Sequence, residues 1–142
     1  MTLYAESSAV LAWLLGEKRG ASIRILLGDA DSIIASDLTL IECERVLIRS
    51  VSLSEMTERQ ATQRRSRLKT AAAHWSLLRV APEIVDRARR RFPREPVRTL
   101  DALHLSSAML ASSAVDDFAV LTLDDRIRRN VVELGLQVLP GK

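Results

Sequence analysis

The chain has 142 residues, of which 47% are hydrophobic and 27% are charged, and this balance is typical of one folded globular domain rather than a disordered chain. No apolar run approaches the ~20 residues that cross a bilayer, and no basic leader with a small-residue cleavage site is visible, so we expect neither a membrane span nor a signal peptide. The single cysteine, Cys43, cannot form an intramolecular disulfide. We therefore expect a single domain over residues 1–142, located in the reducing cytoplasm.

The formal net charge of +3 hides an uneven distribution along the chain. Residues 59–98 hold twelve Lys or Arg against three acids, whereas the remaining residues hold nine basic against fifteen acidic side chains. A basic middle between acidic flanks suits a protein that binds a phosphate backbone. The structural alternative is a basic helix surface that is only solvated by water.

Hydrophobic periodicity and breaker residues predict strands that alternate with helices. In chain order we expect a strand at 3–6, a helix at 9–15, a helix at 18–27, a strand at 32–35, a helix from 38, a basic helix at 54–74, a strand at 76–80, a helix from 82 to about 92, a helix at 100–110, a strand at 118–122, a helix to 132 and a strand at 136–139. This order predicts an α/β fold, a three-layer α/β/α sandwich with a mainly parallel central sheet.

Capping residues set the expected helix borders. Ser7 or Ser8 can cap the first helix, and Gly16 can end it. Ser36 or Asp37 can cap the third helix, and Pro82 at a first turn opens another.

For the last two helices, the expected caps are Thr99 and Asp124, and Gly135 ends the final helix.

Four carboxylates stand at the borders of apolar stretches: Glu6, Glu42, Asp101 and Asp124. Glu6 closes the first strand, Asp101 opens a helix, and Asp124 follows the strand at 118–122. Strand ends and helix starts gather at one rim of an α/β sheet. Two unit charges 4 Å apart repel by ~4 kcal/mol at an effective dielectric of 20. The four positions therefore predict a site for a hard divalent cation that removes this repulsion.

Mg²⁺ and Mn²⁺ prefer oxygen ligands in octahedral geometry. The only two histidines, His74 and His104, do not have the spacing of a zinc site. A bound divalent ion can activate water and orient a phosphodiester. His104 follows Asp101 by three residues and could orient that carboxylate, although a hydrogen-bonded core histidine is the simpler interpretation.

Taken singly, each acid also has a structural explanation. Asp124 can be an ordinary helix cap, and Asp101 can complement a helix dipole. Glu42 can be a surface residue that pairs with Arg45 or Arg49. Glu6 can be a turn residue.

The order of the motifs resembles the PIN-domain family. Leu3–Ala9, with Glu6 followed by two serines, is similar to the opening strand and helix of that family, whose first acid is normally Asp. Glu42 with Arg45–Leu47 and Arg49 resembles the second acidic motif. Arg98–Leu105 is very similar to the third, which is the most specific of the set. Val120–Asp124 resembles the fourth motif, so the resemblance covers essentially the whole chain. The small single-domain form is similar to VapC-type toxins of type II toxin–antitoxin pairs.

This resemblance implies a Mg²⁺- or Mn²⁺-dependent endoribonuclease whose catalytic residues are Glu6, Glu42, Asp101 and Asp124. Among these, Glu6, Asp101 and Asp124 would be the metal ligands. It also implies that Ser8 and Thr122 support the pocket, with Asp125 as the alternative to Asp124. The expected partners are an RNA substrate, a small antitoxin protein and a second copy of the chain in a homodimer.

The expected phosphate contacts are arginines. Arg98, just before the third motif, is the best single candidate beside the metal. Arg64, Arg65 and Arg67 could hold RNA farther out, or could only keep a helix soluble.

Two other functions remain open from the sequence. Glu6 reaches one bond farther than Asp, and octahedral Mg²⁺ tolerates misplaced ligands poorly. A catalytically weak or inactive module that binds RNA or protein is therefore the second hypothesis. A receiver-like domain with an acidic phosphorylation pocket is a third, but the chain lacks a suitable Lys near its final strand.

Overall fold

A computed structural model of the chain describes residues 1–141; Lys142, the last residue of the expected domain, lies outside the described residues. One parallel sheet has the strand order β3-β2-β1-β4-β5. The strands are β1 (Thr2–Ala5), β2 (Ser32–Ser36), β3 (Ser76–Leu78), β4 (Phe118–Leu121) and β5 (Gln137–Leu139). The helices are α1 (Ser7–Leu14), α2 (Gly20–Asp29), α3 (Asp37–Ser52), α4 (Glu58–Ala72), α5 (Pro82–Ala88), α6 (Thr99–Ser112) and α7 (Asp125–Glu133).

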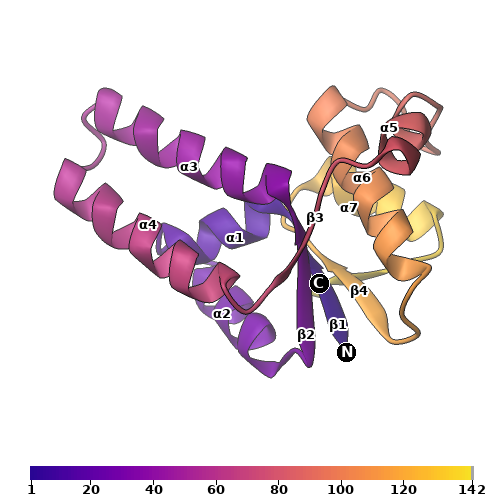
Figure 1. Cartoon of the computed structure of the whole chain (residues 1–142), viewed down its shortest axis with the longest axis horizontal. Coiled ribbons are helices and arrows are strands. Elements are labelled where there is room, and N and C mark those ends of the chain that lie inside the picture. Colours follow the sequence, from indigo (N-terminus) through magenta and orange to yellow (C-terminus); the bar gives the residue numbers. More distant parts are fainter. Residues whose placement is uncertain (142) are drawn as a thin grey trace.

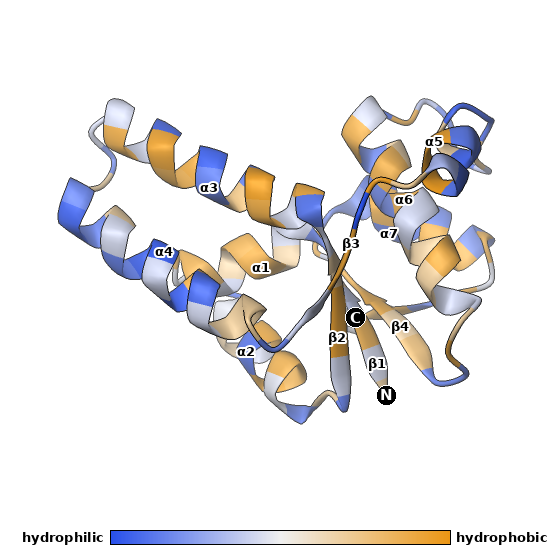
Figure 2. Ribbon diagram, viewed as in Figure 1, coloured by the Kyte–Doolittle hydropathy of each residue, from blue (hydrophilic) through white to orange (hydrophobic). Residues whose placement is uncertain are grey.

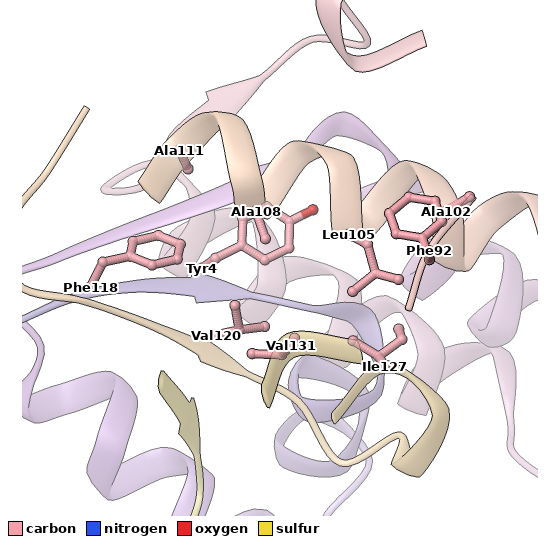
Figure 3. Packing of buried hydrophobic residues seen from close by; sticks show 10 residues of the cluster. All are labelled: Tyr4, Phe92, Ala102, Leu105, Ala108, Ala111, Phe118, Val120, Ile127 and Val131. Carbon is pink, nitrogen blue, oxygen red and sulfur yellow. The ribbon is translucent and has the colours of Figure 1, made fainter. Parts of the chain in front are cut away.

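Helices cover both faces of the sheet, with α1 to α4 on one side and α5 to α7 on the other (Figure 1). The alternation of side chains along β1 explains this arrangement, because successive residues of a strand point to opposite faces. Tyr4 packs with residues of α6 and α7, as Figure 3 shows, whereas Leu3 and Ala5 pack with residues of α1 to α4. The predicted three-layer α/β/α sandwich with a parallel sheet is confirmed.

Apolar residues of the strands and of the inner helix faces form the core, while polar residues cover the outer faces (Figure 2). None of the helices in residues 1–141 is both long and apolar enough to cross a membrane.

Three expected helix borders need correction. The residue that caps α1 is Glu6 itself, whose carboxylate accepts a hydrogen bond from the Ser8 backbone amide, and neither Ser7 nor Ser8 is the cap. Thr99 is the first residue of α6 rather than its cap, because Arg98 has the extended backbone of the capping position. The helix that begins at Pro82 ends at Ala88, earlier than expected.

The expected basic helix at 54–74 is also shorter than predicted. Residues 53–57 form a turn in which Ser54 has a φ of +58°, and α4 begins only at Glu58. Thr57 and Gln60 form a capping box there, which satisfies two backbone amides at the start of the helix. In contrast, the predicted caps Ser36 and Asp124, and the helix ends at Gly16 and Gly135, are confirmed.

The register of the sheet brings distant residues to one edge. β1 and β4 are parallel neighbours, and Ala5 pairs with Leu121 at their carboxyl ends. Glu6 and Thr122, which follow these two residues, are therefore adjacent although 116 residues separate them. β2 lies on the other side of β1, and α3 begins directly after it. The carboxyl edge of the sheet is thus the place where the candidate acids can meet.

Candidate active site

Glu6 is the most tightly held of the four acids. Its side chain stands at the start of α1, and the residue is only 4% exposed. Oε1 accepts hydrogen bonds from the hydroxyls of Ser8 and Thr122, both at 2.5 Å, and Oε2 accepts from the Ser8 amide at 3.0 Å. Three donors and a helix N-terminus therefore stabilise the buried carboxylate.

The hydroxyls of Ser8 and Thr122 connect Glu6 to the segment that follows β4. The Ser8 hydroxyl accepts a hydrogen bond from the Leu123 amide at 2.9 Å, and the Thr122 hydroxyl accepts one from the Asp124 amide at 3.1 Å. Each hydroxyl thus donates to Glu6 and accepts from the backbone beyond β4. The structure brings both predicted supporting residues to Glu6 and fixes where the chain leaves the sheet.

Asp124 caps α7 through one oxygen. Oδ1 accepts from the amides of Arg126 at 2.9 Å and Ile127 at 3.1 Å. Oδ2 accepts no hydrogen bond from residues 1–141. Asp125, the predicted alternative, is the exposed first residue of α7, and its backbone carbonyl accepts from the Arg129 side chain. Asp124, and not Asp125, is therefore linked to Glu6 through Thr122.

Glu42 lies on α3 with its carboxylate directed to α1 and α6. Oε1 accepts from the Ser7 hydroxyl at 2.8 Å and contacts Nε2 of His104 at 2.5 Å. The alternative in which Glu42 pairs with Arg45 or Arg49 is wrong, since no such ion pair forms in the described residues. Partial burial alone would raise the pKa of Glu42, but the hydrogen bonds from His104 and from the Ser7 hydroxyl outweigh it and lower that pKa.

A buried tyrosine holds the other side of His104. The Tyr4 hydroxyl lies 2.8 Å from Nδ1, and the two rings meet edge to face with centroids 6.1 Å apart. Burial raises the pKa of Tyr4, so its hydroxyl stays protonated and can donate to Nδ1. A neutral His104 then carries its proton on Nε2 and donates it to Glu42.

Sequence reasoning missed this chain of contacts. The sequence spacing suggests that His104 orients Asp101, but its ring nitrogens bind Tyr4 and Glu42, with the Ser7 hydroxyl 3.2 Å from Nε2. The interpretation of His104 as a hydrogen-bonded core residue is confirmed, because it is 1% exposed. Glu42 and His104 are 62 residues apart, so no local spacing could have joined them.

Asp101 lies in the first turn of α6, one helical turn before His104. Its side chain is 13% exposed, and Oδ2 is 3.4 Å from Nε of Arg98, whose side chain is 68% exposed. Oδ1 accepts no hydrogen bond from residues 1–141. Among the described residues, one exposed arginine and the favourable field of the helix N-terminus are what hold Asp101.

In residues 1–141, no group of three or more Asp, Glu, His or Cys side chains is placed to hold a metal ion as it stands. The contacts explain this, because each carboxylate is turned toward its own protein donors. The donor chemistry nevertheless fits a hard divalent cation. Glu42, Asp101 and Asp124 each keep one oxygen that accepts no hydrogen bond from the described residues. Both nitrogens of His104 are occupied, so the available ligands are oxygens, which suit Mg²⁺ or Mn²⁺ rather than Zn²⁺.

The predicted RNA-binding arginines separate into two places. Arg98 contacts Asp101 and belongs to the acid site. The other three, Arg64, Arg65 and Arg67, lie on α4, on the opposite side of the sheet from α6 and α7 (Figure 1). The structure does not bring these two groups together.

The chain matches one family description and several solved structures. The profile of the family described as PIN domain matches residues 3–132. No curated protein sequence matches this chain.

Three structures with a similar fold illustrate the likeness. FitAcB from Neisseria gonorrhoeae has a TM-score of 0.70 at 12% identity, covering 99% of this chain and 97% of that chain. VapC20 from Mycobacterium tuberculosis, described as a sarcin-ricin loop cleaving toxin, has a TM-score of 0.65 at 13% identity, covering 89% and 93%. VapBC2 from Rickettsia felis, solved with a DNA fragment from its promoter, has a TM-score of 0.65 at 13% identity, covering 100% of both chains. At these identities the likeness shows the fold alone.

Proposed function

This chain belongs to the PIN-domain family, and from that membership we propose that it is a metal-dependent endoribonuclease. The proposed catalytic residues are Glu6, Glu42, Asp101 and Asp124. The observation that supports the proposal is that Glu6 and Asp124 follow the carboxyl ends of the neighbouring strands β1 and β4, while His104 joins Glu42 to the helix that Asp101 opens. Glu42, Asp101 and Asp124 each keep one oxygen that accepts no hydrogen bond from residues 1–141.

The proposed reaction is hydrolysis of an RNA phosphodiester. The oxygen of a water molecule attacks phosphorus, one P–O bond breaks, and the leaving oxygen takes up a proton. PIN-domain nucleases generally use divalent metal ions, and Mg²⁺ or Mn²⁺ at this site would neutralise developing charge and orient the water. The oxygen ligands proposed for the ion are those of Glu6, Asp101 and Asp124.

Glu42 is proposed to orient the attacking water. Its Oε1 is occupied by Ser7 and His104, so Oε2 is the atom that can accept a hydrogen bond from water. The lowered pKa of Glu42 keeps this carboxylate ionised at neutral pH. The same lowered pKa makes Glu42 a weak base, because a general base works best with a pKa near the working pH. Its expected contribution is therefore alignment of the water rather than complete removal of a proton.

A second candidate function follows from Glu6. Three protein donors already bind its carboxylate, and two of them share Oε1. If these contacts persist, Glu6 contributes little to an ion, and the protein would be a weak or inactive module that binds RNA or a partner protein. Calorimetric titration with Mn²⁺ separates the two functions, because only the nuclease requires a saturable metal site.

We further propose that the chain is the toxin of a toxin–antitoxin pair and that it forms a homodimer. Solved relatives support a protein partner, including a toxin–antitoxin complex from Klebsiella pneumoniae at 15% identity and a TM-score of 0.61. A hollow beside Glu42 has exposed apolar side chains of Ile41, Leu53 and Leu100 that a partner segment could cover. Co-expression with the product of a small neighbouring reading frame should relieve growth inhibition by this protein.

The direct test of the nuclease function uses purified protein and total RNA. Incubation is carried out with Mg²⁺, with Mn²⁺ and with EDTA, followed by mapping of the cut ends. We expect discrete cuts with either ion and none with EDTA. Cuts that persist in EDTA would contradict metal dependence, and the absence of cuts under all conditions would favour the binding module.

A further inference from the structure

Arginines gather where the segment after α5 meets α7. Residues 89–98 contain five arginines and one acid, and Figure 2 shows this segment beside α5 as strongly hydrophilic. α7 contributes three more arginines, Arg126, Arg128 and Arg129. A hollow of about 430 Å³ is lined by Arg94, Arg98, Arg126 and Arg129, together with Glu95, Pro96 and Val97. We call these four arginines the arginine groove.

Residues 89–98, which contribute Arg94 and Arg98 to the groove, form no helix or strand until α6 begins at Thr99. Side-chain hydrogen bonds nevertheless fix the backbone of this segment. The carboxylate of Glu95 accepts from the amides of Phe92 at 2.8 Å and Val97 at 2.7 Å. Asn130, which is 1% exposed, accepts from the Arg94 amide at 2.9 Å and donates to its carbonyl at 3.1 Å. Because the backbone is fixed before any ligand arrives, binding an anion here costs less ordering entropy than binding to a free loop.

The same contacts leave the groove with excess positive charge. Glu95, the only acid of the segment, is occupied by backbone amides. Arg94 pairs with Glu133 at 2.9 Å, whereas no carboxylate in residues 1–141 lies within ion-pair distance of Arg126 or Arg129. Two guanidinium groups therefore face the hollow without a neutralising partner. Guanidinium binds phosphate, as it binds carboxylate, through two parallel hydrogen bonds, so a phosphate group suits this hollow.

The groove adjoins the acid site at two points. Arg98 contacts Asp101, and the Arg126 amide binds Oδ1 of Asp124. We propose that the arginine groove holds the phosphate backbone of the RNA strand beside the bond to be cut. This role rests on the proposed ribonuclease function and names where its substrate lies. It also replaces α4 as the main basic surface for RNA, because α4 lies across the sheet (Figure 1).

An acidic protein segment is the other anion that the groove could attract. The lining contains only Pro96 and Val97 as apolar residues, and Val97 is half-buried. Several exposed large apolar side chains lie beside Glu42, on α3 and at the start of α6, and none of these lines the groove. A protein segment that binds a surface stably buries apolar area, so the polar groove favours RNA.

The test measures binding without catalysis. A fluorescein-labelled single-stranded oligoribonucleotide is titrated with the full chain in EDTA, and its anisotropy is followed at several salt concentrations. The groove variant carries Arg126→Gln and Arg129→Gln, which retain helix propensity. The matched control carries Arg19→Gln and Arg24→Gln, two exposed arginines at α2 on the other face of the sheet, so the change in net charge is identical.

We expect the groove variant to bind RNA roughly tenfold more weakly, with the slope of log K against log salt reduced by about 1.4, since each single-strand phosphate contact contributes about 0.7. The control should retain its slope. Equal losses of RNA affinity in the groove variant and the control would overturn the proposal. So would a larger loss of affinity in a variant of α4 that carries Arg64→Gln and Arg67→Gln. Displacement of the labelled RNA by polyglutamate at a lower concentration than by unlabelled RNA would also overturn it.

Failure of the groove is distinguishable from failure of the nuclease. If the groove variant binds RNA like the wild type while wild-type protein still cleaves RNA with Mg²⁺, only the groove is wrong. If metal-dependent cleavage is absent while the groove variant loses RNA affinity, the groove stands and the nuclease function fails. Circular dichroism of both variants confirms that neither substitution unfolds the chain.

Discussion

The two acids on the β1–α3 side of the site are held differently from the two at the starts of α6 and α7. Glu6 and Glu42 accept hydrogen bonds from side chains of residues distant in the sequence. Asp101 and Asp124 are held by near neighbours, through one exposed arginine and two backbone amides. The first pair has orientations fixed by the tertiary fold, whereas the second pair can turn toward a ligand at little cost. Substitutions in the two pairs should therefore separate loss of activity from loss of stability.

The largest effect is expected from Asp101→Asn. Loss of a charged oxygen ligand at the helix start should reduce RNA cleavage by about 10²-fold or more. The unfolding free energy in urea should change by less than about 0.5 kcal/mol, because Asp101 makes only one exposed ion pair. A variant that cleaves RNA at the wild-type rate would exclude Asp101 from the chemistry.

Asp124 tests whether a carboxylate can have a structural and a chemical role at once. Asn caps helices about as well as Asp, so Asp124→Asn should retain the stability of α7 while cleavage falls strongly. Asp124→Ala should lose activity and also about 1 kcal/mol of stability. The matched control is Asp125→Asn, since Asp125 is exposed and its side chain forms no hydrogen bond or ion pair within residues 1–141. Loss of activity in Asp125→Asn alone would reassign the fourth acid.

For the pair Glu6 and Glu42, whose orientations the tertiary fold fixes, the test is Tyr4→Phe, which should mainly reduce the stability of the protein. The substitution leaves Nδ1 of a 1% exposed His104 without its hydrogen-bond partner. The expected loss is about 1–3 kcal/mol in the unfolding free energy from urea denaturation. Two-dimensional NMR of the imidazole should show the Nε2–H tautomer in the wild type and a mixture of tautomers in the variant. A wild-type imidazole protonated on Nδ1 alone would contradict the Tyr4–His104–Glu42 arrangement.

The smallest effect is expected from Ser7→Ala, and it should depend on pH. The Ser7 hydroxyl helps to lower the pKa of Glu42 below its ordinary value of 4.5. A carboxyl with a lowered pKa in the folded state stabilises the fold above its unfolded pKa, and this stability is lost as pH falls through the folded value.

In EDTA at pH 7, Ser7→Ala should therefore be less stable than the wild type by about 1–2 kcal/mol. The difference should shrink as the pH falls below 4.5. Urea denaturation of both proteins across this range measures it, with Ser22→Ala on exposed α2 as the control. A difference that stays constant with pH would mean that Ser7 does not act through the charge of Glu42.

Local patterns predicted the elements of the fold better than their borders. Apolar strands at β1 and β4 and the caps Ser36 and Asp124 depend on neighbouring residues, so the sequence was sufficient to find them. The turn before α4 was missed because Ser54 adopts a positive φ without being glycine. The Thr57–Gln60 capping box was a readable signal for that border.

The sequence could predict only those contacts of the site that follow from the positions of the strand ends. Glu6 and Thr122 meet because β1 and β4 are parallel neighbours, which the α/β pattern suggests. The contact of Glu42 with His104 depends on how α3 and α6 are placed across the carboxyl edge of the sheet, and no sequence spacing encodes it. The sequence also did not predict that Glu6 caps α1. Serine is a commoner capping residue than glutamate, so Ser7 and Ser8 were the expected caps.

Calorimetric titration of the apo protein with Mn²⁺ tests most directly whether these acids form a divalent cation site. The wild type should bind Mn²⁺ saturably, and Asp101→Asn should bind it much more weakly while retaining its circular dichroism spectrum. Absence of any binding heat in the wild type at millimolar Mn²⁺ would contradict a metal-dependent nuclease and leave a module that binds RNA or protein.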